Sequence, residues 1–349
     1  MRYKKPAIIL ATLLFASFGI IALLAFLSKN ININKNGFNR QLLTTTLKIG
    51  NQATFPIQMN RMIGTRQGKL YFQGGAAYNI YSTSLDLDSF TNIQLPIQQH
   101  IKLNSGVRMY LNGAHVYLSC KNVPEIIDYN LDSGTVIPYV LKSYYSKEVA
   151  YSKDQFIIRL IDNKTKDPVF IKLDIKNENS RQEDHFSEKN GEGSFPTDGI
   201  LYYDSTTHLG CYTHFYQNGF ICMDTNLNLK LKARTIDTLT KRQVKVVHVG
   251  NSSTMKDPPK YVNMVATVAK GNLFLQSMLQ ADNEFPLDFE ENSAIDVYSL
   301  TTGAYKGSFY IPVFKGRKTY EFHIVDNSLI ALYGKTVVTY DLNLPDLLK

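Results

Sequence analysis

The hydrophobic positions of this chain form two contrasting patterns. From Pro6 to Leu27 the sequence reads PAIILATLLFASFGIIALLAFL, without a charged residue, an amide or a histidine. At about 1.5 Å rise per residue, a helix of this length covers roughly the 30 Å hydrocarbon core of a bilayer. After Gln41, short runs rich in Val, Ile, Tyr, Phe and Thr alternate with polar turns, and no convincing helical period follows. The pattern predicts one N-terminal transmembrane helix and then an all-β domain.

The residues around the apolar segment predict its orientation. Arg2, Lys4 and Lys5 precede it without a neighbouring acid, so the positive-inside rule places the N-terminus in the cytoplasm. A cleaved signal peptide is the alternative, but bulky residues occupy the end of the segment where a peptidase needs small ones. We therefore expect a cytoplasmic tail (1–5), a signal-anchor helix in the bilayer (6–27), a polar spacer (28–41) and a β domain (42–349). This predicts a single-pass protein of the cytoplasmic (inner) membrane, N-in and C-out, with the main domain periplasmic or extracellular.

A short pattern recurs six times in the β domain. Each copy has apolar residues, an aromatic or aliphatic residue, then Asp, Ser or Asn and a polar turn. The copies begin at Ile80, Ile126, Phe170, Phe220, Ile295 and Val337, and their fourth positions are Thr83, Tyr129, Leu173, Met223, Tyr298 and Tyr340. Successive fourth positions are 46, 44, 50, 75 and 42 residues apart. Four of these spacings match a four-stranded propeller blade of roughly 40 to 50 residues.

A strand-like run precedes each copy, so the repeating unit is a hairpin with flanking strands. These runs begin at Lys69, His115, Gln155, Leu209, Asn272 and Ser328. The spacing of 75 residues predicts either an insertion, which we favour, or a degenerate seventh blade. The last copy ends near the C-terminus, so the final blade lacks an outer strand, and the segment 42–49 is expected to supply it and close the ring. The prediction is a six-bladed β-propeller, with seven blades as the alternative.

With these repeats, residues 42–345 resemble the six-bladed propellers of the TolB-like and NHL-like group. Calcium-dependent lactonases and quinone-dependent dehydrogenases share this architecture. The resemblance therefore implies a ring of blades around a central channel but does not choose a function.

Composition and charge narrow the classes of partner. The chain has 349 residues, with 22 tyrosines, 19 phenylalanines and a formal net charge of +8. Three of the 38 bases precede the apolar segment, so the rest of the chain carries 35 bases against 30 acids, and these bases are spread along the chain. No nucleic-acid partner is expected for a chain that is exported in this way. The densest basic cluster is Lys230, Lys232, Arg234, Lys241, Arg242 and Lys245. It is interpreted as a solvated surface, with contact to anionic lipid or cell-wall polymer as the alternative.

The three cysteines are too few for a disulfide framework. Asn218-Gly219 is a favourable two-residue hairpin turn, and with that turn Cys222 faces Phe215 while Cys211 lies several residues away. This register would hold the two α-carbons beyond the roughly 7 Å limit for a bridge. We expect Cys120, Cys211 and Cys222 to be small buried residues without disulfides.

No catalytic motif stands out, so candidate site residues come from polar positions in predicted inner strands. Arg108 lies in the inner strand of the second blade, Asp198 precedes that of the fourth, and Glu321 and His323 lie in that of the last. Since inner strands line the central channel, these four residues are candidate ligand-binding residues at its mouth. Each is also consistent with an ordinary strand-end position. No catalytic or metal-binding residue is predicted.

The sequence therefore predicts a membrane-anchored extracytoplasmic binding or scaffolding module for a protein, peptide or envelope polymer, without a cofactor. The alternative is a lactonase-like or quinone-dependent dehydrogenase-like enzyme with its site in the channel. Calcium or quinone is expected only under that alternative.

Overall fold

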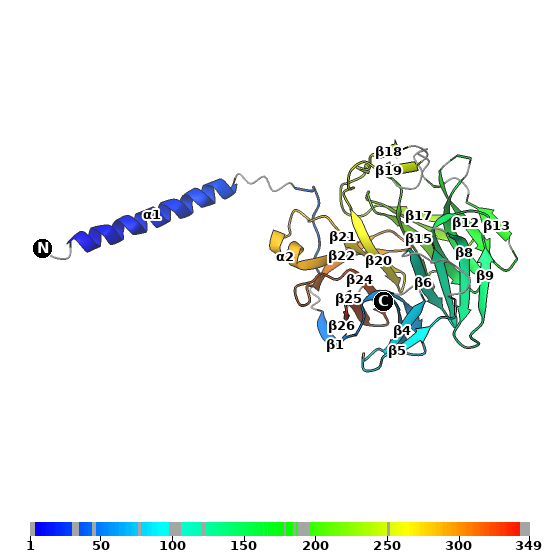
Figure 1. Cartoon of the computed structure of the whole chain (residues 1–349). Helices are drawn as coiled ribbons and strands as arrows, with labels where there is room; N and C mark the ends of the chain where they lie inside the picture. The colour runs from blue at the N-terminus through cyan, green and yellow to red at the C-terminus, as the bar shows by residue number, and fades with distance from the viewer. Residues whose placement is uncertain are drawn as a thin grey trace. The chain divides into compact units, whose positions relative to one another are not determined.

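The fold was analysed in a computed structural model of the whole chain (Figure 1). Two compact units are present, Met1–Asn36 and Gly37–Lys349. The structure describes residues 4–29, 35–43, 47–75, 78–97, 106–120, 123–162, 164–165, 167–177, 179–183, 186–187, 196–249 and 252–342.

The first unit consists of helix α1, Lys4–Lys29. Pro6 lies in its first turn, where the missing N–H breaks no helical hydrogen bond. Large apolar side chains such as Ile8, Leu10 and Phe15 are exposed along it. Side chains are described for residues 5, 6 and 8–24 of α1. Among the described residues, no helix combines the length and hydropathy needed to cross a membrane. The anchor at 6–27 stays a prediction.

The second unit contains six antiparallel four-stranded sheets, which are the blades of a propeller. Blade 1 comprises β2 (Met59–Arg66), β3 (Lys69–Gly74), β4 (Asn79–Ser84) and β5 (Thr91–Gln94). Blade 2 comprises β6 (Val107–Asn112), β7 (His115–Cys120), β8 (Val123–Asn130) and β9 (Val136–Val140). Blade 3 comprises β10 (Tyr145–Ser152), β11 (Gln155–Ile161), β12 (Pro168–Asp174) and β13 (Asn179–Gln182).

The remaining blades follow the same order. Blade 4 comprises β14 (Gly199–Asp204), β15 (Leu209–His214), β16 (Phe220–Asp224) and β17 (Leu229–Ala233). Blade 5 comprises β20 (Asn263–Ala269), β21 (Asn272–Ser277), β22 (Asn292–Ser299) and β23 (Tyr305–Pro312), with helix α2 (Pro286–Glu291) before β22. Blade 6 comprises β24 (Glu321–Val325), β25 (Ser328–Tyr333), β26 (Thr336–Asp341) and β1 (Lys48–Thr54).

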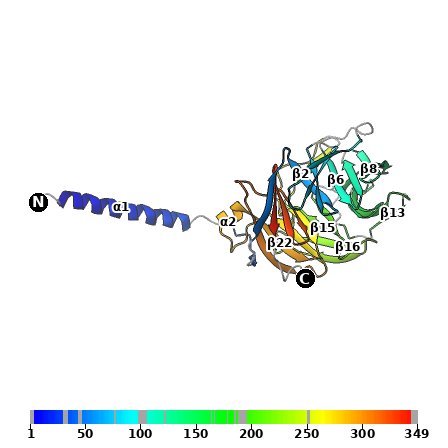
Figure 2. The same ribbon diagram turned by 90° about the horizontal axis from the view of Figure 1, so that it is seen from below.

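Hydrophobic packing between neighbouring blades closes the ring. Six core clusters each join two consecutive blades, and one of them joins Leu70 and Phe72 of blade 1 to Ile330 and Leu332 of blade 6. Figure 2 shows the blades that carry labelled strands following one another around the unit in chain order. Because each sheet is covered on both faces by its neighbours, its strands are apolar on both faces. The predicted six-bladed propeller is confirmed.

The chain ends pair to complete blade 6, as predicted, but in a shifted position. Strand β1 pairs antiparallel with β26, and Ala53 lies opposite Val337. The expected outer strand was 42–49, whereas Leu42 instead forms a parallel bridge with Ser308 of blade 5. The N-terminal segment of this unit therefore contacts blade 5 before it enters blade 6.

The repeat corresponds to the same place in every blade. Its fourth position lies in the third strand and faces the second residue of the second strand, as in the pairs Leu70–Thr83, Leu273–Tyr298 and Leu329–Tyr340. All six fourth-position side chains are buried. In blade 4 the facing residue is Gly210, where a Cβ would collide with Ile157 of blade 3.

The polar residue that ends the repeat forms the expected turn. Asp224 accepts hydrogen bonds from the backbone N–H groups of Asn226 and Asn228, both at 2.9 Å. Together with the Asn228 side chain and Lys230, these bonds lower the pKa of Asp224 to about 2, although burial acts in the opposite direction. Asp174 and Asn130 accept equivalent bonds at the same position of their blades. The short side chain thus directs the chain into the outer strand.

The long spacing between the fourth and fifth copies is an insertion, as favoured above. Strand β17 completes blade 4, and β18 (Val246–Val249) with β19 (Ser252–Met255) forms a separate two-stranded sheet. Two strands do not make a seventh blade.

The prediction about the cysteines is wrong. Cys211 and Cys222 face each other across β15 and β16 with α-carbons 4.2 Å apart, and they form a disulfide. Asn218-Gly219 is not a two-residue turn, because β15 ends at His214 and β16 begins at Phe220. The longer connection shifts the register and brings the cysteines together. Cys120 is buried and takes no part in the disulfide.

Candidate functional site

The first strands of the blades line the axis of the propeller. In chain order they are β2, β6, β10, β14, β20 and β24. Contacts join β10 to β14, β14 to β20, β20 to β24, β24 to β2 and β2 to β6. A channel of about 470 Å³ is lined by residues of all six strands. Since every blade is wound the same way, these inner strands run in one direction, and their first residues meet at one end of the channel.

That end gathers ionisable side chains from five blades. They lie within the first four positions of an inner strand or directly before one. We define the axial cluster as Arg61 of β2, Arg108 of β6, Lys147 and Glu148 of β10, Asp198 before β14, and Glu321 and His323 of β24.

Glu321 joins blade 6 to blade 1. Its carboxylate accepts a hydrogen bond from His323 Nε2 at 2.8 Å and one from the backbone N–H of Met62 at 3.1 Å. Arg61 Nε lies 3.7 Å from the other carboxylate oxygen. Strand alternation explains the first contact, because residues 321 and 323 project from the same face of β24. The histidine is thereby fixed at the axis with a carboxylate beside it.

Arg108 and Glu148 have perturbed acidities. Burial lowers the pKa of Arg108, and the positive charge of Arg61 adds to the effect, while Glu148, Asp198 and Glu321 oppose it. Burial also raises the pKa of Glu148. A hydrogen bond from the Ser119 hydroxyl and the positive charge of Arg108 partly offset this rise. A raised carboxyl pKa means that this environment disfavours the charged form of Glu148.

Lys147 connects blades 3 and 4. It is buried, and its Nζ lies 3.0 Å from a carboxylate oxygen of Asp198 and 5.4 Å from the centre of the Phe215 ring. Asp198 also accepts a hydrogen bond from the backbone N–H of Gly199 at the start of β14. The ammonium group is thus held by a carboxylate and an aromatic face.

The structure brings the four predicted site residues to the same end of the channel. Arg108 and His323 line the channel itself, Glu321 contacts His323, and Asp198 lies at the start of β14 with Lys147. Their role in binding stays a prediction. The sequence reading missed Arg61, Lys147 and Glu148, although each is a charged residue near the start of an inner strand, which is the signal that identified Arg108.

The cluster can donate and accept hydrogen bonds on the same surface. It combines guanidinium and ammonium donors with three carboxylates, so its formal charges balance when His323 is neutral. Among the described residues, no group of three or more His, Cys, Asp or Glu side chains is arranged to hold a metal ion. The arrangement suits a polar ligand or partner that presents both donors and acceptors.

Comparisons with known proteins identify the fold. No protein family matches the sequence, and no curated protein does. A solved structure of a DUF4221 family member from Bacteroides vulgatus is similar, with 12% identity, a TM-score of 0.53, and coverage of 85% of this chain and 97% of that one. A catalytically inactive virginiamycin B lyase from Staphylococcus aureus, solved with quinupristin, has 10% identity, a TM-score of 0.49, and coverage of 85% and 99%. A luciferin-regenerating enzyme has 11% identity, a TM-score of 0.45, and coverage of 84% and 93%.

These similarities concern architecture alone, and they do not confirm the TolB-like or NHL-like group in particular. The six four-stranded sheets make the chain an all-β, six-bladed propeller with internal repeats, and the similarity to the DUF4221 structure concerns this fold. Such a fold is suited to a generic binding or scaffolding module, since it presents loops and strand ends from several blades around one axis.

Proposed function

We propose that this protein is a membrane-tethered binding propeller whose axial cluster recognises a polar group of an extracytoplasmic protein, peptide or envelope polymer. The observation that carries the proposal is the convergence of charged side chains from five blades on one end of the channel. The stability of the propeller does not require these charges, because the apolar clusters that hold the blades together lie between the blades.

The tether is supported by the composition of residues 6–27. Twenty-two consecutive residues without a charge cover roughly 30 Å as a helix, and a charged side chain near the centre of a bilayer is unfavourable by about 3 kcal/mol on insertion scales. With this tether, the tail that contains Arg2, Lys4 and Lys5 stays in the cytoplasm, and the propeller lies on the opposite side of the membrane.

The tether is tested by fractionating cells that express the full chain. We expect the protein in the membrane fraction after alkaline carbonate washing, and Phe15→Lys with Ile21→Lys should release it. The matched control is Asn32→Lys with Asn34→Lys, which adds the same charge outside the apolar segment. Recovery of the unaltered chain in the soluble fraction would contradict the tether.

Ligand recognition is tested with the detergent-solubilised full chain. The probes are tripeptides with free termini and soluble cell-wall fragments, measured by calorimetry. Glu321→Gln keeps the side-chain shape but removes the charge that faces Arg61 and His323, so binding is expected to weaken about tenfold, equivalent to about 1.4 kcal/mol. Glu290→Gln, an exposed position in α2, is the matched control. Equal affinities for both variants would place recognition away from the axial cluster.

An enzyme in the same channel is the second candidate. The observation that favours it is the position of His323 against Glu321, in the same cluster as Glu148 with its raised pKa, because such groups can transfer protons. Turnover of a lactone or sugar alcohol by the purified chain with added calcium or quinone, abolished by Glu148→Gln, would replace the binding proposal.

A further inference from the structure

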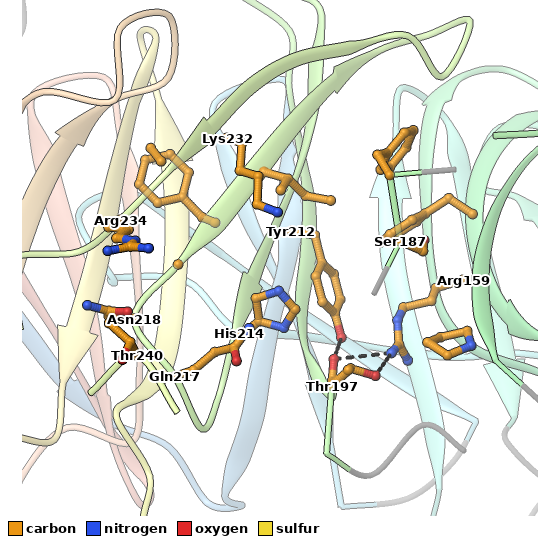
Figure 3. A pocket seen from close by; sticks show the side chains of 17 residues that line it. Arg159, Ser187, Thr197, Tyr212, His214, Gln217, Asn218, Lys232, Arg234 and Thr240 are labelled. Atoms are coloured by element: carbon orange, nitrogen blue, oxygen red, sulfur yellow. Dashed lines mark hydrogen bonds between the residues drawn. The ribbon is translucent and has the colours of Figure 1, made fainter. Parts of the chain in front are cut away.

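A second cavity lies between blades 3 and 4, and none of its described lining residues belongs to the axial cluster. Its volume is about 440 Å³, and strands β11, β12, β15, β16 and β17 contribute to its walls. We call it the blade 3–4 pocket. In Figure 3, Tyr212 and His214 lie between Arg159 on one side and Arg234 on the other, with Lys232 above them.

The described walls of this pocket carry positive charge without negative charge. Arg159, Lys232 and Arg234 line it, and no described lining residue is Asp or Glu. Lys232 of the outer strand β17 and Arg234, which directly follows that strand, are exposed, whereas Arg159 on β11 is 1% exposed. In the described part of the chain, none of the three forms an ion pair.

Arg159 differs in this respect from the other buried cations that the structure describes. Arg40 is paired with Glu284 and Asp296, and Lys147 is paired with Asp198. The hydrogen bonds of Arg159 go only to neutral oxygens: the carbonyl and hydroxyl of Thr197 at 3.1 and 2.6 Å, and the Ser146 hydroxyl at 3.2 Å. A buried guanidinium normally has an anionic partner, because its desolvation is otherwise uncompensated.

The remaining walls indicate what an anionic partner would carry. Phe170, Phe186, Tyr212 and Phe220 supply aromatic surface, and the Arg159 guanidinium lies 5.1 Å from the centre of the Tyr212 ring. Ser187, Asn218 and Thr240 add hydrogen-bonding groups along the walls. An arginine fork with nearby lysine is suited to phosphate and sulfate oxygens, and the aromatic walls suit a flat organic body.

We propose that the blade 3–4 pocket binds a small organic oxyanion, with its phosphate or sulfate group at Arg159 and its body against the aromatic walls, while Lys232 and Arg234 add positive charge to the rest of the lining. The pocket shares no described lining residue with the central channel, so it would act as a second ligand site of the propeller.

The test uses the full-length protein in detergent, with phenyl phosphate, phenyl sulfate, inorganic phosphate and benzyl alcohol as probes in calorimetry. We expect phenyl phosphate or phenyl sulfate to bind about tenfold more tightly than inorganic phosphate, and benzyl alcohol to bind more weakly than the phenyl esters. The preferred ester distinguishes phosphate from sulfate. Equal affinity for benzyl alcohol would overturn the proposal, because an uncharged ligand would then suffice.

Variants locate the site. Arg159→Met should weaken binding of the preferred ester at least tenfold, and Arg159→Lys should weaken it less. Since Arg159 is buried, Lys232→Gln and Arg234→Gln test the same site from exposed positions, each with an expected threefold loss. Lys69→Gln, an exposed lysine of blade 1, removes the same charge elsewhere and should leave affinity unchanged. Equal loss in Lys69→Gln would reveal non-specific charge attraction and overturn the proposal.

One further variant examines a competing source of negative charge. The segment 188–195, EKNGEGSF, lies outside the described residues and contains Glu188 and Glu192. Binding by the unaltered chain supports the proposal. The opposite outcome is that anions bind only to the double variant Glu188→Gln, Glu192→Gln. In that case the cations of the blade 3–4 pocket pair with the carboxylates of this segment in the unaltered chain, and the proposal is overturned.

Discussion

The axial cluster and the blade 3–4 pocket both collect cations, but they balance charge differently. In the axial cluster, Lys147 faces Asp198 and Arg61 faces Glu321, so cations and carboxylates from different blades stand together. In the pocket, Arg159 is more deeply buried than Arg61 yet contacts only neutral oxygens. Convergence of charged side chains and a buried cation without a carboxylate partner are therefore separate signs of a site. The first suits a ligand with both donors and acceptors, and the second requires an anion.

The largest expected loss of stability follows from removing the disulfide of blade 4, which forms one wall of the blade 3–4 pocket. Cys211→Ala with Cys222→Ala removes a disulfide that closes a short loop between β15 and β16. The loss of unfolding free energy should be about 3 kcal/mol, from loop-closure entropy. Denaturation in urea measures it. The matched control is Cys120→Ala, a buried cysteine outside the disulfide, and a similar loss in both proteins would contradict the structural importance of the bridge.

Lys147→Met should have the next largest effect, because it leaves Asp198 without its ammonium partner. We expect the unfolding free energy to fall by about 2 kcal/mol, the range of a hydrogen bond between charged groups. Adding Asp198→Asn should restore part of the loss, since no unpaired carboxylate then remains. A double-mutant cycle from urea denaturation measures this coupling, and additive losses would refute the ion pair.

Arg159→Met should destabilise the ligand-free protein less than Lys147→Met does. The substitution removes hydrogen bonds to neutral oxygens but leaves no carboxylate behind, so a loss of about 1 kcal/mol is expected. Urea denaturation of both variants in the same buffer, free of phosphate and sulfate, makes the comparison. A larger loss for Arg159→Met would show that its charge is already compensated within the protein.

The smallest expected effect is a change in pH dependence at Glu148. Its pKa in the folded protein is raised above the ordinary 4.5, so the unfolded chain loses this proton first as the pH rises. This group's contribution to stability is therefore present below pH 4.5 and declines as the pH rises through the folded-state pKa. Glu148→Gln should make the unfolding free energy less dependent on pH in that window. Urea denaturation across the window tests this, and parallel profiles would refute the raised pKa.

Much of the fold could be predicted because each blade repeats a local pattern. The fourth position of the repeat is apolar or small since it packs in the third strand, and Asp224 or Asn130 follows because a short polar side chain forms the turn. These constraints act over a few residues and are visible without the tertiary structure. The same reasoning located Arg108 and His323 on inner strands.

The pairing of the cysteines shows where local reasoning fails. Asn218-Gly219 is a typical hairpin turn, but the Asn218 side chain donates to the Asp237 carbonyl and its backbone N–H donates to the Leu239 carbonyl. Residues beyond the hairpin therefore hold the connection in a longer form. A register decided by such contacts cannot be deduced from the dipeptide alone.

The amino-acid sequence by itself determined the apolar segment, the all-β character, the six repeats and the turn residues, because these depend on spacing along the chain. Only the tertiary structure decided which charges meet. Glu321 reaches Arg61 because blade 6 closes against blade 1, and Arg159 shares a cavity with Lys232 because blade 3 packs against blade 4. Electrostatic environments depend on distances between blades, and sequence separation carries no information about those distances.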